Sequence, residues 1–149
     1  MSAALVLDSS VIVKWFRQGE ILAEQALVLR NAYLGGRVSL LAPVLCVFEI
    51  ANVLRYKEDL TAEQIQEAVQ SLFEIGLDFI APSVGLMRRV VEIALDCKIT
   101  VYDATFVALA ENLEVEFITA DKSLVDRLKD FSFVRYLGDI EPEKLNAED

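Results

Sequence analysis

The chain has 149 residues, of which 54% are hydrophobic, and its few Gly and Pro residues exclude a disordered protein and favour one compact domain. It contains no histidine, which excludes a Ser-His-Asp triad and a zinc site built on imidazoles. The formal net charge of −10 argues against broad electrostatic binding to nucleic acid, and no apolar run reaches the ~18 residues that span a bilayer.

Short apolar stretches alternate with helical patterns along the whole chain. In the first part we expect a strand at Ala3–Leu7, helical residues at Ser10–Arg17, a helix at Glu20–Leu34, a strand at Val38–Ala42 and a helix at Val44–Lys57. In the second part we expect a helix from Thr61 to about Ile75, a strand at Phe79–Ala81, a helix from Ser83 to about Cys97, a helix at Asp103–Asn112, a strand at Glu116–Thr119, a short helix at Lys122–Lys129 and a strand at Phe133–Leu137.

Several helix boundaries carry signals of their own. Gly35 and Gly36 are typical of a helix end. Pro43 suits the first position of the next helix, where its missing N–H costs nothing. Thr61, followed three residues later by Gln64, forms a capping box. Ser83 can cap the helix that follows it.

Strands that alternate with helices indicate an α/β fold with a central, mostly parallel sheet of about five short strands and helices on both faces. Residues 1–140 have no linker that would divide them, and we expect a single domain followed by a frayed acidic tail at 141–149. The N-terminal apolar run is too short for a signal peptide, and Cys46 and Cys97 have no CxxC spacing. We therefore expect a cytoplasmic protein with two buried, reduced thiols.

Two aspartates follow directly on predicted strands. Asp8 ends the first apolar run, and Asp121 comes two residues after the strand at Glu116–Thr119. In an open α/β sheet this edge, at the carboxyl ends of the strands, is where ligands bind. The same positions also suit helix N-caps, which need an acceptor for the first free amides of the helix. Each residue alone fits either interpretation.

A third acid, Glu49, lies on a helix that is apolar on nearly every side. Such a helix is buried, and an unpaired buried carboxylate is costly. Asn52 lies three residues on and shares a helix face with it. The structural alternative is an ion pair between Glu49 and a nearby base such as Arg55 or Lys57, but we favour a functional role.

Asp103 lies in the first turn of another apolar helix, where interaction with the helix dipole is the simpler explanation. The combination of four acids is more informative than any one of them, because all lie where the core meets one edge of the sheet. Clustered carboxylates raise one another's pKa unless cations neutralise them, and Mg²⁺ or Mn²⁺ prefers such oxygen ligands. Two such ions can catalyse phosphodiester hydrolysis without histidine. The hydroxyls of Ser10 and Thr119 can support the carboxylates.

At these residues the sequence resembles the PIN domain, and specifically the VapC-type toxins of toxin–antitoxin pairs. Four segments carry the resemblance, in the order and at about the spacing of the family, and the likeness extends from Leu5 to Gly138. They are LVLDSSVIVKWF (Leu5–Phe16), APVLCVFEIANVLR (Ala42–Arg55), TVYDATFVALAE (Thr100–Glu111) and FITADKSL (Phe117–Leu124).

The resemblance implies a PIN-like three-layer α/β/α fold and a magnesium- or manganese-dependent endoribonuclease that cleaves single-stranded RNA. It also implies a homodimer and a cognate antitoxin whose tail enters the acidic groove; the negative net charge suits a basic tail better than it suits RNA. The residues that match the metal-coordinating acids of the family are Asp8, Glu49, Asp103 and Asp121. Those that match its supporting polar positions are Ser10, Asn52 and Thr119.

Other classes of protein fit the pattern less well. A haloacid-dehalogenase-like phosphatase would use Asp8 as nucleophile but needs an acid two residues later, where this chain has Ser10. A phospho-accepting receiver domain needs adjacent acids after the first strand. A PIN-like module that only binds other proteins is a further alternative, as is a complex with the antitoxin that represses its own operon. The intact set of four acids favours the nuclease.

Overall fold

Five parallel strands form the central sheet in the part of the chain that the computed structural model describes, residues 3–17 and 19–141. Their order across the sheet is β3-β2-β1-β4-β5. The strands are β1 (Ala3–Leu7), β2 (Val38–Pro43), β3 (Asp78–Ile80), β4 (Glu116–Thr119) and β5 (Val134–Tyr136). The sheet is thus entirely parallel, whereas the sequence predicted a mostly parallel one.

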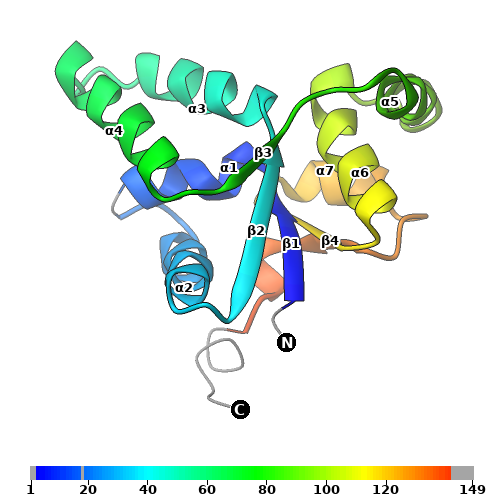
Figure 1. Cartoon of the computed structure of the whole chain (residues 1–149), viewed down its shortest axis with the longest axis horizontal. Coiled ribbons are helices and arrows are strands. Elements are labelled where there is room, and N and C mark those ends of the chain that lie inside the picture. The colour runs from blue at the N-terminus through cyan, green and yellow to red at the C-terminus, as the bar shows by residue number, and fades with distance from the viewer. Residues whose placement is uncertain (1–2, 18, 142–149) are drawn as a thin grey trace.

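Helices cover both faces of this sheet (Figure 1). On one side lie α1 (Ser9–Ile12), the 3₁₀ turn η1 (Val13–Phe16), α2 (Ala23–Leu34), α3 (Leu45–Arg55) and α4 (Ala62–Glu74). On the other side lie α5 (Val84–Cys97), α6 (Val101–Leu113) and α7 (Lys122–Arg127), and a 3₁₀ turn, η2 (Leu137–Asp139), follows β5. The predicted three-layer α/β/α fold is confirmed.

The order of the strands reverses at β1, which pairs with β2 on one side and with β4 on the other. The chain moves from β1 outward to β3 and then returns to β4, so the connections after β1 and β4 leave the sheet toward opposite faces. In open parallel sheets such a switch point leaves a crevice at the carboxyl ends of the strands. Asp8 follows β1 and Asp121 follows β4, which places both acids at this crevice.

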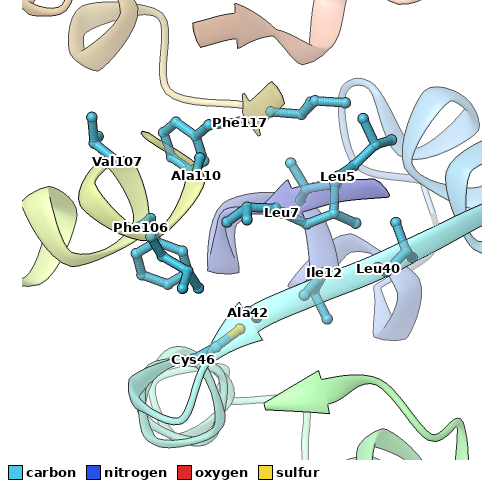
Figure 2. Packing of buried hydrophobic residues seen from close by; sticks show 14 of the residues in the cluster. Leu5, Leu7, Ile12, Leu40, Ala42, Cys46, Phe106, Val107, Ala110 and Phe117 are labelled. Atoms are coloured by element: carbon cyan, nitrogen blue, oxygen red, sulfur yellow. The ribbon is translucent and has the colours of Figure 1, made fainter. Parts of the chain in front are cut away.

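The core packs around β1 and α6. Seven consecutive residues of α6, from Ala104 to Ala110, are buried, so this helix is enclosed on all sides. The rings of Phe106 and Phe117 lie 6.0 Å apart and join α6 to β4, and Figure 2 shows their neighbours from β1, β2, α1 and α3. Because the core is continuous up to the edge of the sheet, the acids at that edge are held by rigid elements.

Several helix starts differ from the prediction; α6, for example, begins at Val101 and not at Asp103. The helix expected from Glu20 begins at Ala23, because Leu22 adopts a left-handed conformation with φ of 67°. Pro43 is the last residue of β2, where it pairs with Ile80, and it does not open a helix. The pairing of β2 with β1 has ended before this position, so the N–H that proline lacks is not needed for a hydrogen bond between these strands. The helical stretch expected at Ser10–Arg17 starts at Ser9 and tightens into a 3₁₀ turn.

Two predicted caps are confirmed. The Thr61 hydroxyl accepts a hydrogen bond from the Gln64 amide, and the Gln64 side chain accepts one from the Thr61 amide, which completes the capping box. Ser83 caps α5 through the amide of Leu86. No helix of the described residues is long and apolar enough to cross a membrane, and of the predicted tail all but Glu141 lies outside those residues.

Candidate active site

Asp8 is the centre of the candidate site. Its side chain is only 6% exposed, and both carboxylate oxygens accept hydrogen bonds. Oδ1 accepts from the Ser9 amide at 3.0 Å, whereas Oδ2 accepts from the hydroxyls of Ser10 at 2.7 Å and Thr119 at 2.8 Å. Asp8 is thus the N-cap of α1, as the structural interpretation predicted, but capping alone does not require two further hydroxyl donors. These bonds fix the orientation of the carboxylate.

Glu49 reaches the same edge from α3. Its Oε1 accepts a hydrogen bond of 2.8 Å from the hydroxyl of Ser9, the residue that follows Asp8. Ser9 therefore touches two of the four acids, one through its backbone and one through its side chain. Glu49 forms no ion pair with a described residue, and Arg55 instead lies over the ring of Tyr56. The ion-pair alternative for Glu49 is therefore wrong.

Asp121 is the N-cap of α7. Its Oδ1 accepts hydrogen bonds from the Leu124 amide at 3.2 Å and the Ser123 hydroxyl at 2.7 Å. Its own amide donates to the Thr119 hydroxyl at 3.0 Å, and that hydroxyl donates to Asp8. Thr119 thus links the carboxyl ends of β1 and β4.

Asp103 lies in the first turn of α6, as predicted, and the Thr100 hydroxyl accepts a hydrogen bond from its amide at 2.9 Å. Burial and the charge of Asp121 raise the pKa of its carboxyl group.

Burial and neighbouring charges raise the pKa values of Asp8, Glu49 and Asp103. Burial, with a smaller effect from the charge of Asp103, raises the pKa of Asp8 from its usual 3.8 to about 6, although the hydroxyls of Ser10 and Thr119 oppose the shift. Burial also raises the pKa of Glu49, with further effects from the charges of Asp8 and Asp103. The acids therefore act on one another as a single cluster of negative charge.

No base of the described residues neutralises this cluster. The ion pairs of that part of the chain involve other acids, and not one includes Asp8, Glu49, Asp103 or Asp121. Lys14 and Arg17, which follow Asp8 in sequence, pair with Glu20 and Asp59 instead. Asp8 is buried, Glu49 and Asp103 are half-buried and Asp121 is exposed, and such a group of like charges without a counter-charge in the described chain favours the binding of a cation.

The scan against protein families matches the PIN domain over residues 5–129. The chain belongs to the PIN domain family. PIN domains are generally nucleases and typically use divalent metal ions. The comparison with curated proteins gives no significant match.

Solved structures resemble this PIN domain over nearly its whole length. PAE2754 from Pyrobaculum aerophilum is 16% identical with a TM-score of 0.67, and the match covers 99% of this chain and 100% of that one. A toxin–antitoxin complex from Klebsiella pneumoniae is 19% identical with a TM-score of 0.61, covering 95% and 98% of the two chains. FitAB bound to the IR36 DNA fragment is 16% identical with a TM-score of 0.67, covering 92% and 97%. At these identities the likeness concerns the fold.

The donor set of this PIN domain suits a hard cation such as Mg²⁺ or Mn²⁺. Carboxylates and hydroxyls supply only oxygen, and the chain has no histidine. Within residues 3–17 and 19–141, no group of three or more acids and thiols is close enough to enclose a metal ion. The acids are therefore near enough to perturb one another but do not form a closed cage. A cation bound here would keep several water ligands, as Mg²⁺ commonly does in proteins.

Sequence reasoning named most of the polar residues near the acids but missed Ser9, and the supporting role expected for Asn52 stays a prediction. Ser9 is buried and bonds to Glu49, and its only sequence signal is its place between Asp8 and a second serine. Asn52 is exposed and has no hydrogen bond to the acids. Ser9 supports the site from within.

Proposed function

We propose that this PIN domain is a metal-dependent endoribonuclease that cleaves single-stranded RNA and is the toxin of a VapBC-type toxin–antitoxin pair. The observation that carries the proposal is the coupled cluster of carboxylates at the switch point of the sheet, which has no base of the described chain to neutralise it. Asp8, Glu49, Asp103 and Asp121 hold Mg²⁺ or Mn²⁺, and Ser10 and Thr119 keep Asp8 in place.

The bound cation would supply an activated water and stabilise the negative charge that develops on the phosphodiester. Hydroxyl groups of the chain orient the Asp8 carboxylate. The Ser10 hydroxyl donates to Asp8 Oδ2 and accepts from the Ala120 amide at 3.0 Å, so it joins α1 to the turn after β4. With Thr119 bonded to the same Oδ2, the Asp8 carboxylate cannot turn without breaking two hydrogen bonds. Preorganised ligands of this kind avoid a cost of reorganisation during the reaction.

Cleavage of a mixed single-stranded RNA by the purified protein tests this function. We expect cleavage with Mg²⁺ or Mn²⁺, none with EDTA, and none by Asp8→Asn, which controls for contaminating ribonuclease. Retained cleavage by Asp8→Asn would exclude the site. If folded protein cleaves no RNA under any metal condition, two alternatives remain: a narrowly specific toxin, and a PIN domain that acts only through protein contacts. Metal titration separates them, because only the toxin is expected to bind the cation.

The antitoxin is expected to be a protein with a basic segment. Of the similar structures, the one from Klebsiella pneumoniae is a toxin–antitoxin complex, and another is FitAB bound to a DNA fragment. The net charge of −10 and the unneutralised acids of this chain favour a partner that brings Lys or Arg side chains to the site. Such a partner would compete with the cation, so EDTA-treated protein should still bind it.

The homodimer expected for the family would form through the outer face of α5. Val84, Val91 and Leu95 are exposed on this face although the helix also has an apolar inner side. Arg88 and Glu92 lie among them, one helical turn apart. If two copies of α5 crossed antiparallel about a two-fold axis midway between these residues, Arg88 of each would face Glu92 of the other, which lies 4.0 Å from Arg89 of its own helix.

Light scattering on a sizing column tests this dimer with two matched variants. Leu95→Glu places a charge on the outer face of α5, and we expect it to give a monomer. Leu34→Glu places the same charge on an equally apolar exposed residue at the end of α2 and should leave the dimer intact. A monomeric wild-type protein at tens of micromolar would exclude this interface, without bearing on the nuclease.

A further inference from the structure

Ser9 occupies an unusual place between an acid of the site and a buried thiol. Its Oγ lies 2.8 Å from Glu49 Oε1 and 3.3 Å from Cys46 Sγ. Cys46 and Glu49 are three residues apart on α3, so they lie on neighbouring turns of one face. Ser9 is 7% exposed and Cys46 is fully buried, and Figure 2 shows Cys46 reaching from α3 toward Ala42 in the core.

The Ser9 hydroxyl has a single proton for these two neighbours. A carboxylate at 2.8 Å is the stronger acceptor, so the proton points to Glu49. Burial raises the pKa of the Cys46 thiol to about 12, so the sulfur keeps its proton. The geometry of the Ser9–Cys46 contact alone would make Ser9 the donor, but its proton is committed to Glu49, so the contact is a hydrogen bond only when the thiol donates to Ser9 Oγ. The three groups then form one directed chain of hydrogen bonds, from thiol to hydroxyl to carboxylate.

This chain of bonds leaves one carboxylate oxygen of Glu49 available. Oε1 is held by Ser9, and no hydrogen bond from a described residue reaches Oε2. Glu has three rotatable side-chain bonds, so without Ser9 the carboxylate would sample several orientations at the edge of the site. With Ser9 in place, the second oxygen is fixed in one direction.

We propose that Ser9, anchored by Cys46, is a positioning residue that orients Glu49 for the cation. The inference rests on the proposed function in one respect, namely that Glu49 binds a metal. It goes beyond that function because it assigns a role to two residues that are neither acids nor ligands of the cation.

The test measures Mn²⁺ affinity from the electron paramagnetic resonance signal of the free ion. We expect Ser9→Ala to weaken binding by about tenfold or more, as is typical when a residue that orients a metal ligand is removed. Cys46→Ala should weaken it by about two- to fivefold, the value of one neutral hydrogen bond. Cys46→Ser keeps a donor to Ser9 and should bind Mn²⁺ as the wild type does.

Thr105→Val is the matched control for the loss of a buried hydroxyl. Thr105 is also 7% exposed, and its hydroxyl bonds only to the Val101 carbonyl within α6. It should lose a little thermal stability without any change in Mn²⁺ affinity, whereas Ser9→Ala should change the affinity. Far-ultraviolet circular dichroism confirms that each variant is folded before it is titrated.

The outcomes separate this inference from the proposed function. Wild-type affinity in folded Ser9→Ala, or equal weakening by Ser9→Ala and Thr105→Val, would overturn the role of Ser9 while leaving the metal site intact. Equal weakening by Cys46→Ala and Cys46→Ser would overturn the role of the thiol proton. A wild-type protein that binds no Mn²⁺ would overturn both the metal site and this inference.

Discussion

Two sets of carboxylates in this protein have opposite electrostatic surroundings. Glu111 of α6 accepts two hydrogen bonds from Arg89 of α5, at 2.6 and 3.0 Å, and this guanidinium holds the pKa of Glu111 below its usual range. At the carboxyl edge of the sheet, burial holds the pKa values of Asp8 and Glu49 above theirs. Both sets lie close to α6, so the difference comes from their immediate neighbours.

The two sets of carboxylates obtain their counter-charge from different sources. Glu111 has its cation within the chain, in a partly exposed pair of ordinary strength. Asp8 and Glu49 have hydroxyl donors but no base, and hydroxyls do not neutralise charge. A cation from solution would complete the second set, whereas it has nothing to add to the first. Glu111→Gln is therefore the matched change at an acid that already has its partner.

The largest difference should appear in catalysis. Asp103→Asn and Asp121→Asn each remove one negative charge from the site, and we expect RNA cleavage to fall to the level of a protein-free control because cation binding depends on that charge. Glu111→Gln should cleave at nearly the wild-type rate. Initial rates at saturating Mg²⁺ measure the effect; comparable losses in all three variants would mean that the two sets of acids do not differ in function.

A smaller but direct difference should appear in thermal stability with metal. Mg²⁺ at about 100 times its dissociation constant should stabilise the wild type by about 2.7 kcal/mol, and EDTA should reverse the effect. For a chain of this size the shift in melting temperature is roughly 2–4 °C per kcal/mol. Glu111→Gln should show the same shift and Asp8→Asn none. A shift that survives in Asp8→Asn would place the cation elsewhere.

The pH dependence of the metal-free protein should differ in sign between the two sets. The pKa of Asp8 rises from 3.8 in the unfolded chain to about 6 in the fold, so between these values the folded protein retains a proton that the unfolded chain has released. The contribution of Asp8 to stability is therefore fully present below pH 3.8 and is lost as the pH rises through about 6. The loss amounts to about 3 kcal/mol.

Urea unfolding in EDTA between pH 4 and 7 measures this contribution. Relative to the wild type, Asp8→Asn should become more stable as the pH rises, because it lacks the group that is costly to ionise. Glu111 has a lowered pKa, so its contribution is present at neutral pH and is lost as the pH falls. Glu111→Gln should therefore become less stable than the wild type toward neutral pH; slopes of the same sign for both variants would contradict the comparison.

The smallest effect concerns the Arg89–Glu111 pair itself. Both side chains are more than a third exposed, so solvent screens their attraction. We expect Arg89→Gln to lower the free energy of unfolding by less than about 1 kcal/mol, and 1 M salt to remove most of the difference. A loss of several kcal/mol in denaturant unfolding would show that this pair is not an ordinary surface pair.

The sequence predicts a helix or strand well where local signals mark both of its ends. The strands Ala3–Leu7 and Glu116–Thr119 have the predicted bounds, because apolar runs there stop at polar residues. The start expected at Glu20 is wrong, since the left-handed conformation of Leu22 reflects the path of the chain and not a helix signal. The role of Pro43 depends on where β1 stops pairing, which is a long-range property.

The sequence identifies the four acids as candidates but not the hydroxyls that hold each of them. Ser9 and Ser10 are adjacent and chemically alike, yet Ser9 donates to Glu49 and Ser10 to Asp8. Successive residues of a helix point about 100° apart, so which serine meets which acid depends on how α1 lies against α3. The link between Thr119 and Asp8 spans 111 positions and comes from the pairing of β1 with β4.

The most direct measurement is calorimetric titration of metal-free protein with Mn²⁺, comparing the wild type with Asp8→Asn and Glu111→Gln. If the cluster at the sheet edge takes its counter-charge from solution, the wild type and Glu111→Gln will bind Mn²⁺ with the same affinity, and Asp8→Asn will show no saturable binding. Equal binding by all three proteins, or no binding by the wild type, would contradict the assignment of the four carboxylates as a metal site.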